Sequence, residues 1–182
     1  MKKYILLIIV IGLGVISCSN PNEKEIGEVN ALISIVEETE KSLLSVDTSV
    51  VFDAKRQMDK DIAMLNQYID TVNREEAFRL DDVLGNKKKI HNLMKNYPEF
   101  IKQINFSKNQ LTNLKQDLEN DLMNKKDFKT HYAMEQEQLM VLNNQINKVV
   151  GNIDLAIEKL KSDRPELLEI IERRKLRASD NE

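Results

Sequence analysis

Apolar residues spaced three and four apart constrain this chain more than any other feature. That spacing places them on one face of a helix. Only five glycines and three prolines occur among 182 residues, so the sequence offers few turns. The most regular run is a heptad seam formed by Ile90, Leu93, Tyr97, Phe100, Ile104, Leu111, Leu114 and Leu118. The pattern predicts an all-α fold, an elongated helical bundle or antiparallel coiled-coil hairpin of four to five helices over residues 26–177.

Three further apolar runs have the same spacing. They comprise Ile26, Val29, Ile33, Val36 and Leu43; Val51, Ala54, Met58, Ile62, Leu65, Ile69 and Val72; and Tyr132, Leu139, Leu142, Ile146, Val149, Ile153, Ala156 and Leu160. Asp47 is a good capping residue between the first two runs, and Gly85 suits the end of a helix. The second run also carries charges of alternating sign, which predict a solvent-exposed, salt-bridged face: Asp53, Lys55, Arg56, Asp59, Lys60 and Asp61.

Two prolines fall within the helical patterns, and each predicts a break. A proline in a helix interior costs about 3 kcal/mol, whereas in the first turn it costs little. Asn96 can cap a helix that starts near Pro98, which leaves a short helix over 86–95. Asp163 can likewise cap a new helix whose first turn contains Pro165.

Polar residues interrupt the apolar pattern around residues 124–127. A reversal there turns two long helices into an antiparallel hairpin. The alternative is one continuous helix of more than sixty residues that pairs in trans as a coiled coil. The hairpin is the favoured interpretation. Residues 127–161 then form one helix about 50 Å long at about 1.5 Å per residue.

The amino-terminal segment has the organisation of a secretory signal. Lys2 and Lys3 precede an apolar run over Ile5–Val15. A transmembrane helix needs about 20 apolar residues, so this run is too short to span a bilayer. It matches the apolar region of a signal peptide, about 7–15 residues behind a basic start.

Val15, Ile16, Ser17 and Cys18 follow that run, and this order resembles the lipobox of bacterial lipoproteins. The resemblance covers residues 1–18 only. It implies cleavage after Ser17 and attachment of a diacylglyceryl group and an amide-linked acyl chain to Cys18. On this interpretation residues 1–17 are the signal peptide and 18–25 a lipidated tether. An uncleaved amphiphilic helix, or an ordinary secretory signal with an incidental cysteine, is the alternative.

The residues after the lipobox bear on location. Ser19 stands where Asp would resemble the inner-membrane retention signal of enteric bacteria. In a cell with two membranes we therefore expect delivery to the outer membrane, with the periplasmic face favoured. The segment 22–25 faintly resembles the acidic export signals of Bacteroidota lipoproteins, so display on the cell surface is the alternative.

The sequence contains no recognisable catalytic constellation, and the single cysteine is the expected lipidation site. Removal of residues 1–17 leaves 25 basic and 30 acidic residues, a net charge of −5, which argues against nucleic acid as a partner. His131 and Glu135 have the i, i+4 spacing of a metal pair, but no second pair accompanies them. We therefore expect no cofactor, no metal site and no enzyme activity.

Basic residues cluster near the end of the chain, at Arg173, Arg174, Lys175 and Arg177. Complementarity to the negative end of a helix accounts for them, and binding of an acidic partner is the alternative. Residues 178–182 should fray.

The expected function is that of a lipid-anchored cell-envelope protein with a non-catalytic scaffold, spacer or protein-binding role. Its partners would be the membrane, through Cys18, and an envelope protein or a second copy. A periplasmic chaperone-like or ligand-binding bundle is the alternative.

Overall fold

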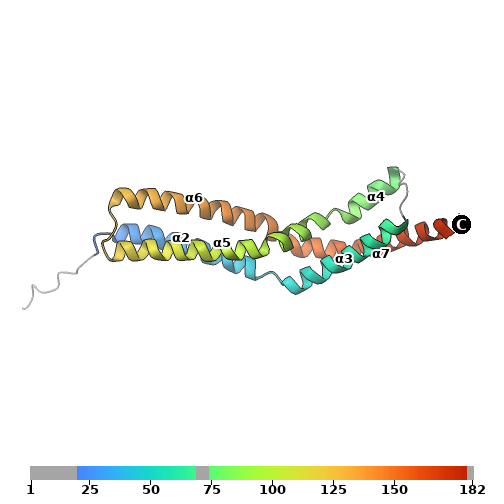
Figure 1. The fold of residues 1–182 in the computed structure, drawn as a ribbon, viewed down its shortest axis with the longest axis horizontal. Coiled ribbons are helices and arrows are strands. Elements are labelled where there is room, and N and C mark those ends of the chain that lie inside the picture. The colour runs from blue at the N-terminus through green and yellow to red at the C-terminus, as the bar shows by residue number, and fades with distance from the viewer. Residues whose placement is uncertain (1–19, 69–73, 180–182) are drawn as a thin grey trace, which may run out of the picture.

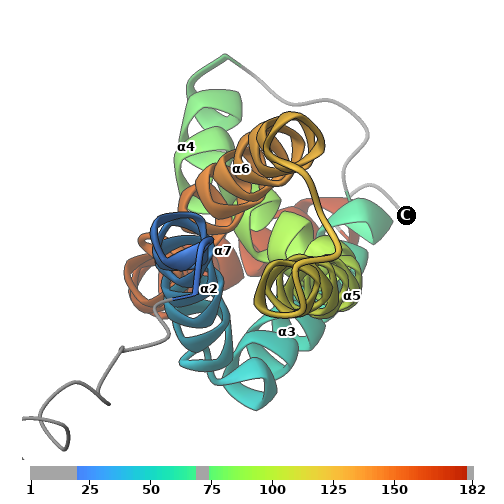
Figure 2. The same cartoon turned by 90° about the vertical axis from the view of Figure 1, so that its left-hand side faces the viewer.

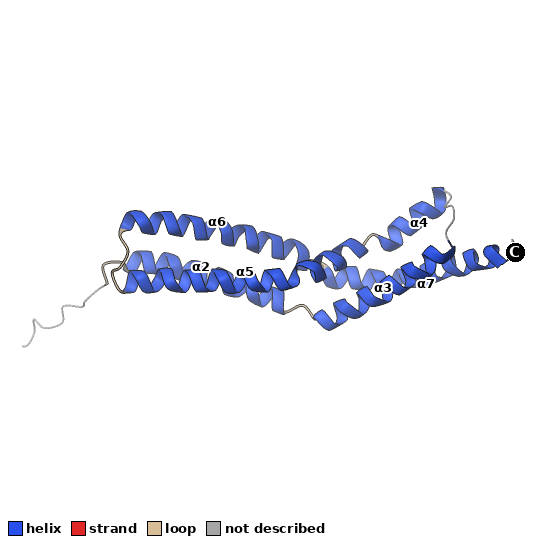
Figure 3. Cartoon of the chain, viewed as in Figure 1, coloured by secondary structure: helices blue, strands red, loops and turns tan. Residues whose placement is uncertain are grey.

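The computed structural model describes residues 20–68 and 74–179, and these are helical apart from short turns, with no strand among them. The helices are α2 (Glu23–Leu44), α3 (Thr48–Tyr68), α4 (Arg74–Leu84), α5 (Lys87–Glu119), α6 (Lys125–Val150) and α7 (Ile153–Ser179). They form an elongated bundle, as the apolar periodicity predicted (Figures 1 and 3). The described residues contain six helices rather than four or five.

The bundle consists of two three-helix segments in series. In one half α2, α5 and α6 pack against one another, and in the other half α3 and α7 pack together and against α5. Helix α4 packs against α7 at the far end. Figure 2, viewed along the rod, shows the helices grouped around a common axis. Helix α5 has 33 residues and spans about 50 Å.

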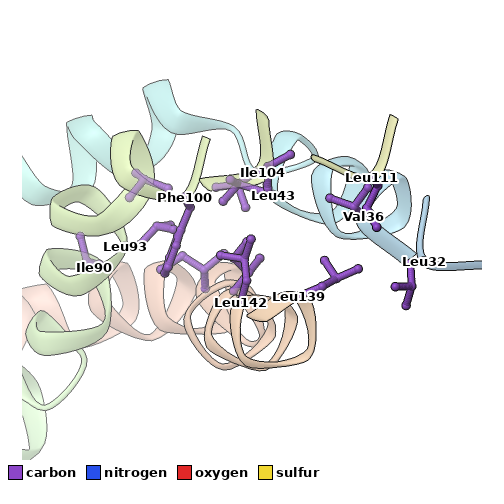
Figure 4. Close-up of a cluster of buried hydrophobic side chains, with 14 of the residues drawn as sticks. Leu32, Val36, Leu43, Ile90, Leu93, Phe100, Ile104, Leu111, Leu139 and Leu142 are labelled. Atoms are coloured by element: carbon purple, nitrogen blue, oxygen red, sulfur yellow. The ribbon is translucent and has the colours of Figure 1, made fainter. Parts of the chain in front are cut away.

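The predicted apolar faces form the core. Every residue of the heptad seam is buried except Tyr97, which is partly buried against the same cluster. Figure 4 shows these side chains meeting those of α2 and α6. Leu32 is fully buried and was not predicted. A second, smaller core joins α3, α4 and α7 through Leu65, Leu80, Val83, Leu167, Ile170 and Ile171.

The hairpin between α5 and α6 is confirmed, but the chain reverses over residues 120–124 rather than 124–127, because α6 already begins at Lys125. We call residues 120–124 the α5–α6 turn. Asp121 adopts a left-handed conformation with φ 55°. The Leu122 N–H donates to the Asp117 carbonyl at 2.8 Å, and the Asp121 N–H donates to the Leu118 carbonyl at 3.2 Å. These two bonds are those of a Schellman motif. The Asn124 side chain then caps α6.

The breaks predicted at the two prolines are wrong. Pro98 lies inside α5, and Pro165 lies inside α7. Asn96 does not cap a helix but donates its side-chain amide to the Asn92 carbonyl at 2.8 Å. Both prolines are exposed, while apolar residues on either side of each are buried. Leu93 and Phe100 flank Pro98 in the larger core, and Leu160 and Leu167 flank Pro165 in the larger and the smaller core. Packing of those flanking side chains outweighs the local cost of the proline ring.

The predicted continuous helix over 127–161 is also wrong, because α6 and α7 are separated by Gly151 and Asn152. Asn152 has φ 67°. A Cβ atom on Gly151 would lie 2.6 Å from the Asn147 carbonyl oxygen, so the turn requires a glycine there. Val149 and Ile153 continue the apolar spacing across the turn, which hid the break in the sequence.

Two of the remaining boundaries agree with expectation and two differ from it. The Asp47 carboxylate accepts hydrogen bonds from the Ser49 and Val50 N–H groups at the start of α3, and α4 ends just before Gly85. Helix α2 begins at Glu23, so the last three residues of the expected tether are helical. Ala178 and Ser179 are helical rather than frayed. Ile69, Val72 and residues 1–19 and 180–182 lie outside the described residues.

Among the described helices, none combines the length and the apolar character that crossing a membrane requires.

Candidate functional site

A groove about 380 Å3 in volume runs between α3 and α7. It is lined by Val50, Asp53, Ala54, Arg56, Gln57 and Lys60 of α3 and by Ile157, Leu160, Lys161 and Arg164 of α7. The lining residues of each helix recur at intervals of three and four along the chain, so each helix contributes one face. Two side chains of each helix are apolar, and four of the others are cationic. We call this feature the α3–α7 groove.

A buried ion pair fixes α7 to α3 beside the α3–α7 groove. Asp61 is only 1% exposed, which contradicts its predicted place on the solvent-exposed face. Its two carboxylate oxygens accept hydrogen bonds from Arg164 Nε at 2.7 Å and Nη2 at 3.2 Å. Gln57 Nε2 donates a third bond at 3.0 Å. Donating these hydrogen bonds to Asp61 raises the pKa of the Arg164 guanidinium above its ordinary value.

The sequence contained a signal for this burial. Asp61 follows Met58 by three residues and precedes Leu65 by four, and both of these are buried. The spacing places Asp61 on the apolar face of α3. The prediction was wrong because the helical position of Asp61, and not the charge of its sequence neighbours, decides its burial. The other charges on α3 do form exposed pairs, Lys55 with Asp59 and Arg56 with Asp53.

The rim of the α3–α7 groove has an excess of positive charge. Arg56 pairs with Asp53 at 2.9 Å, and Arg164 pairs with the buried Asp61. Within residues 20–68 and 74–179, Lys60 and Lys161 form no ion pair. The groove therefore combines an apolar lining with unneutralised cations, which is complementary to a ligand that has both apolar and acidic groups.

The basic cluster near the end of α7 holds α4 in place. Arg174 forms a bidentate pair with Glu76 of α4, and both side chains are largely buried. Its hydrogen bond is the main cause that lowers the pKa of the Glu76 carboxyl below its ordinary value. Arg79 of α4 also pairs with Glu166 of α7, at 2.7 Å. Helix-end complementarity is therefore only part of the explanation for these arginines, which also join two helices.

The two histidines lie on different helices, His91 on α5 and His131 on α6, and both are exposed. Glu135 follows His131 by one turn, as the sequence indicated. In the described part of the chain, no group of three His, Cys, Asp or Glu side chains is close enough to hold a metal ion. Burial raises the pKa of the Glu135 carboxyl, and the charge of His131 opposes this effect. The Oε2 atom of Glu135 has no hydrogen-bond partner within the described residues.

Glu135→Gln is therefore expected to increase the free energy of unfolding at pH 7, because the variant has no charge to bury. The pKa of Glu135 is higher in the folded state than in the unfolded state. The wild-type protein therefore loses stability as the pH rises from the unfolded-state pKa through the folded-state pKa. The gain should therefore shrink as the pH falls toward about 4. Urea unfolding across this pH range measures the difference, and Glu137→Gln, at an exposed neighbouring position, serves as the control. A gain that does not depend on pH would contradict the assignment.

The expected lipidation site, Cys18, lies outside the described residues. The described chain starts at Asn20, beside the α5–α6 turn and at one end of the rod. The α3–α7 groove lies in the other half of the molecule. No protein-family model matches the chain, and no curated protein or solved structure matches it either.

Proposed function

We propose that the protein is a lipid-anchored component of a bacterial cell envelope with a non-catalytic scaffold or spacer role, and that it binds a protein partner away from the membrane. One observation supports this most directly. The end of the chain nearest Cys18 lies at one end of an elongated rod, while the α3–α7 groove lies in the other half. An anchor at one end and a binding surface farther along is the arrangement that a spacer requires.

The proposed location depends on the sequence alone. A basic start, a short apolar run and the order Val15 to Cys18 support lipidation, and two or more acyl chains hold a protein stably on a membrane. In a cell with two membranes we place the protein on the outer membrane, with the periplasmic face favoured over the cell surface.

The charge of the α3–α7 groove indicates the kind of partner. Its apolar side chains can accept the apolar face of a helix, and Lys60 and Lys161 can pair with carboxylates on the flanks of that helix. We propose that the partner presents an acidic amphipathic helix to this groove. Such a helix would add a fourth helix to the segment formed by α3, α5 and α7.

Loss of the anchor is tested by Cys18→Ala. The wild-type protein should start at Cys18 with its lipid attached, whereas the variant should accumulate as an unlipidated form. Intact-mass measurement and metabolic labelling with a fatty acid distinguish the two. Equal lipid labelling of both proteins would overturn the proposed anchor.

Partner binding is tested by a photo-crosslinking amino acid placed at Gln57 in the groove and, as control, at the exposed Lys148 on α6. A defined envelope protein should be captured only from position 57. Lys60→Glu combined with Lys161→Glu should abolish that capture, and Lys148→Glu should leave it unchanged. The same products from both positions would contradict a groove-specific partner.

A ligand-binding or chaperone-like role is the second candidate. It is favoured by a groove of about 410 Å3 between α5 and α6, where Phe106 and Val141 are exposed. An apolar surface that remains after the helices have packed can bind apolar ligands or unfolded clients. Suppression of client aggregation by the folded protein, lost in Phe106→Ser with Val141→Ser, would support this role over the first.

A further inference from the structure

The start of the described chain is tied to the α5–α6 turn by hydrogen bonds. Asn22 is 5% exposed, and its Nδ2 donates to the Leu118 carbonyl at 3.0 Å and to Asp121 Oδ1 at 3.3 Å. Asn20 Nδ2 lies 3.4 Å from the Glu119 carbonyl. These carbonyls belong to the last turn of α5, where a helix lacks its own donors. The point at which the chain enters the bundle is thus fixed beside this turn.

The distance from this point to the proposed lipid is short. Cys18 precedes Asn20 by two residues, and two extended residues span at most about 7 Å. The polar headgroup layer on each side of the hydrocarbon core is of similar thickness, about 5–7 Å. With the acyl chains of Cys18 in the bilayer, the α5–α6 turn is therefore held at the level of the headgroups.

Leu122 projects from this turn and is 74% exposed, more than any other large apolar residue in the described ranges. It occupies the position of the Schellman motif whose apolar side chain usually packs back onto the preceding helix. In this turn the Leu122 N–H donates to the carbonyl of Asp117, so a polar residue occupies that position of α5. The Leu122 side chain remains exposed to solvent. A leucine at this position therefore contributes little to the stability of the hairpin. An apolar contact with something outside the chain would explain why a leucine is present there.

Lysines at the start of α6 indicate the same kind of contact. Lys125 and Lys126 lie at the positive end of the helix macrodipole, where cations are unfavourable. Lys126 has no ion-pair partner within the described residues, and Lys125 reaches only Glu25, at 3.7 Å, while staying 75% exposed. Both residues follow Leu122 within four positions along the chain, and lipid phosphates at that level would neutralise them.

From these observations we infer that Leu122 inserts into the lipid surface next to the anchor, with Lys125 and Lys126 on the phosphates. This inference rests on the proposed lipidation of Cys18. The lipid and the leucine then attach the rod at two points rather than one. Two points restrict its tilt and hold the α3–α7 groove away from the bilayer.

The experiment uses the lipidated protein in vesicles of phosphatidylethanolamine and phosphatidylglycerol. Leu122→Cys supplies the one free thiol, because the Cys18 sulfur carries the lipid, and it is labelled with an environment-sensitive fluorophore. Leu155→Cys, 60% exposed on α7, is the matched control. Emission from position 122 should shift to shorter wavelength on vesicles and lose most of its intensity with brominated lipids, while emission from position 155 should change little.

Three outcomes would overturn the inference. Lipidated protein with equal emission from positions 122 and 155 overturns the insertion of Leu122 and leaves the anchor intact. A shift at position 122 that grows with protein density and resists brominated lipid assigns the surface to a second copy instead. Protein without lipid by mass measurement overturns the anchor and this inference together.

A second measurement tests the orientation of the rod. A donor fluorophore on Leu176→Cys, near the far end of α7, should transfer little energy to an acceptor in the bilayer. Leu122→Asp should raise that transfer several-fold because the rod is then free to lean, whereas Leu155→Asp should not. Equal transfer in all three proteins would contradict attachment at two points.

Discussion

Arg164→Met is expected to lower the free energy of unfolding by about 3 kcal/mol, because it leaves the buried Asp61 carboxylate without its cation. Asp61 is 1% exposed, and only the Gln57 amide would remain to bond it. The Arg164 side chain is itself 37% exposed, so water can reach its place in the variant. We therefore expect a loss at the lower end of the range for broken buried pairs. Urea unfolding followed by circular dichroism measures it.

The matched control is Lys161→Met, which removes an exposed cation from the same helix and the same groove. It should change stability by less than about 0.5 kcal/mol. The double variant Asp61→Leu with Arg164→Met should recover most of the loss, because an apolar pair can replace a buried ion pair with little net effect. Equal stability of Arg164→Met and Lys161→Met would show that the pair contributes nothing.

Pro98→Ala is expected to raise the free energy of unfolding by about 2 kcal/mol, an uncommon direction for a substitution within a helix. Proline has no N–H group, so the Met94 carbonyl one turn earlier lacks its helical donor. Because Pro98 is exposed, alanine restores that bond without opening a cavity in the core. Thermal and urea unfolding both report the gain.

Lys95→Ala, an exposed substitution one turn away on the same helix, separates this effect from general helix propensity. It should leave stability within about 0.5 kcal/mol of the wild type. A loss of stability in Pro98→Ala would mean that the bundle depends on the geometry that the proline imposes on α5.

The helices and most of the core could be predicted from sequence because burial on a helix follows a fixed spacing. The heptad seam shows this, since seven of its eight residues are buried and Tyr97 is partly buried. The same spacing also indicates burial for Asp61, although its charge favours an exposed position. Its partner Arg164 could not be found in this way, because the pairing joins residues 103 positions apart.

Helix boundaries were harder to predict because local and tertiary effects compete there. At Pro98 and Pro165 the local signal favoured a break, and packing of the flanking side chains outweighed it. At Gly151 the apolar spacing favoured continuity, and the chain turned where a Cβ would collide with the Asn147 carbonyl. Neither result could be decided without knowing which surfaces meet. The α3–α7 groove was missed for the same reason, since its two sides come from distant parts of the sequence.

One feature of the architecture determines how the molecule responds to force. Helix α5 is the only described helix that packs in both halves, because the α2–α3 and α6–α7 turns both fall near the middle of the rod (Figure 1). At that level only one helix is continuous, so bending is resisted by α5 and by the larger core, which includes side chains from both halves. We expect the midpoint to be the most compliant level of the rod, with the shared core limiting the bend so that the outer half keeps its distance from the bilayer.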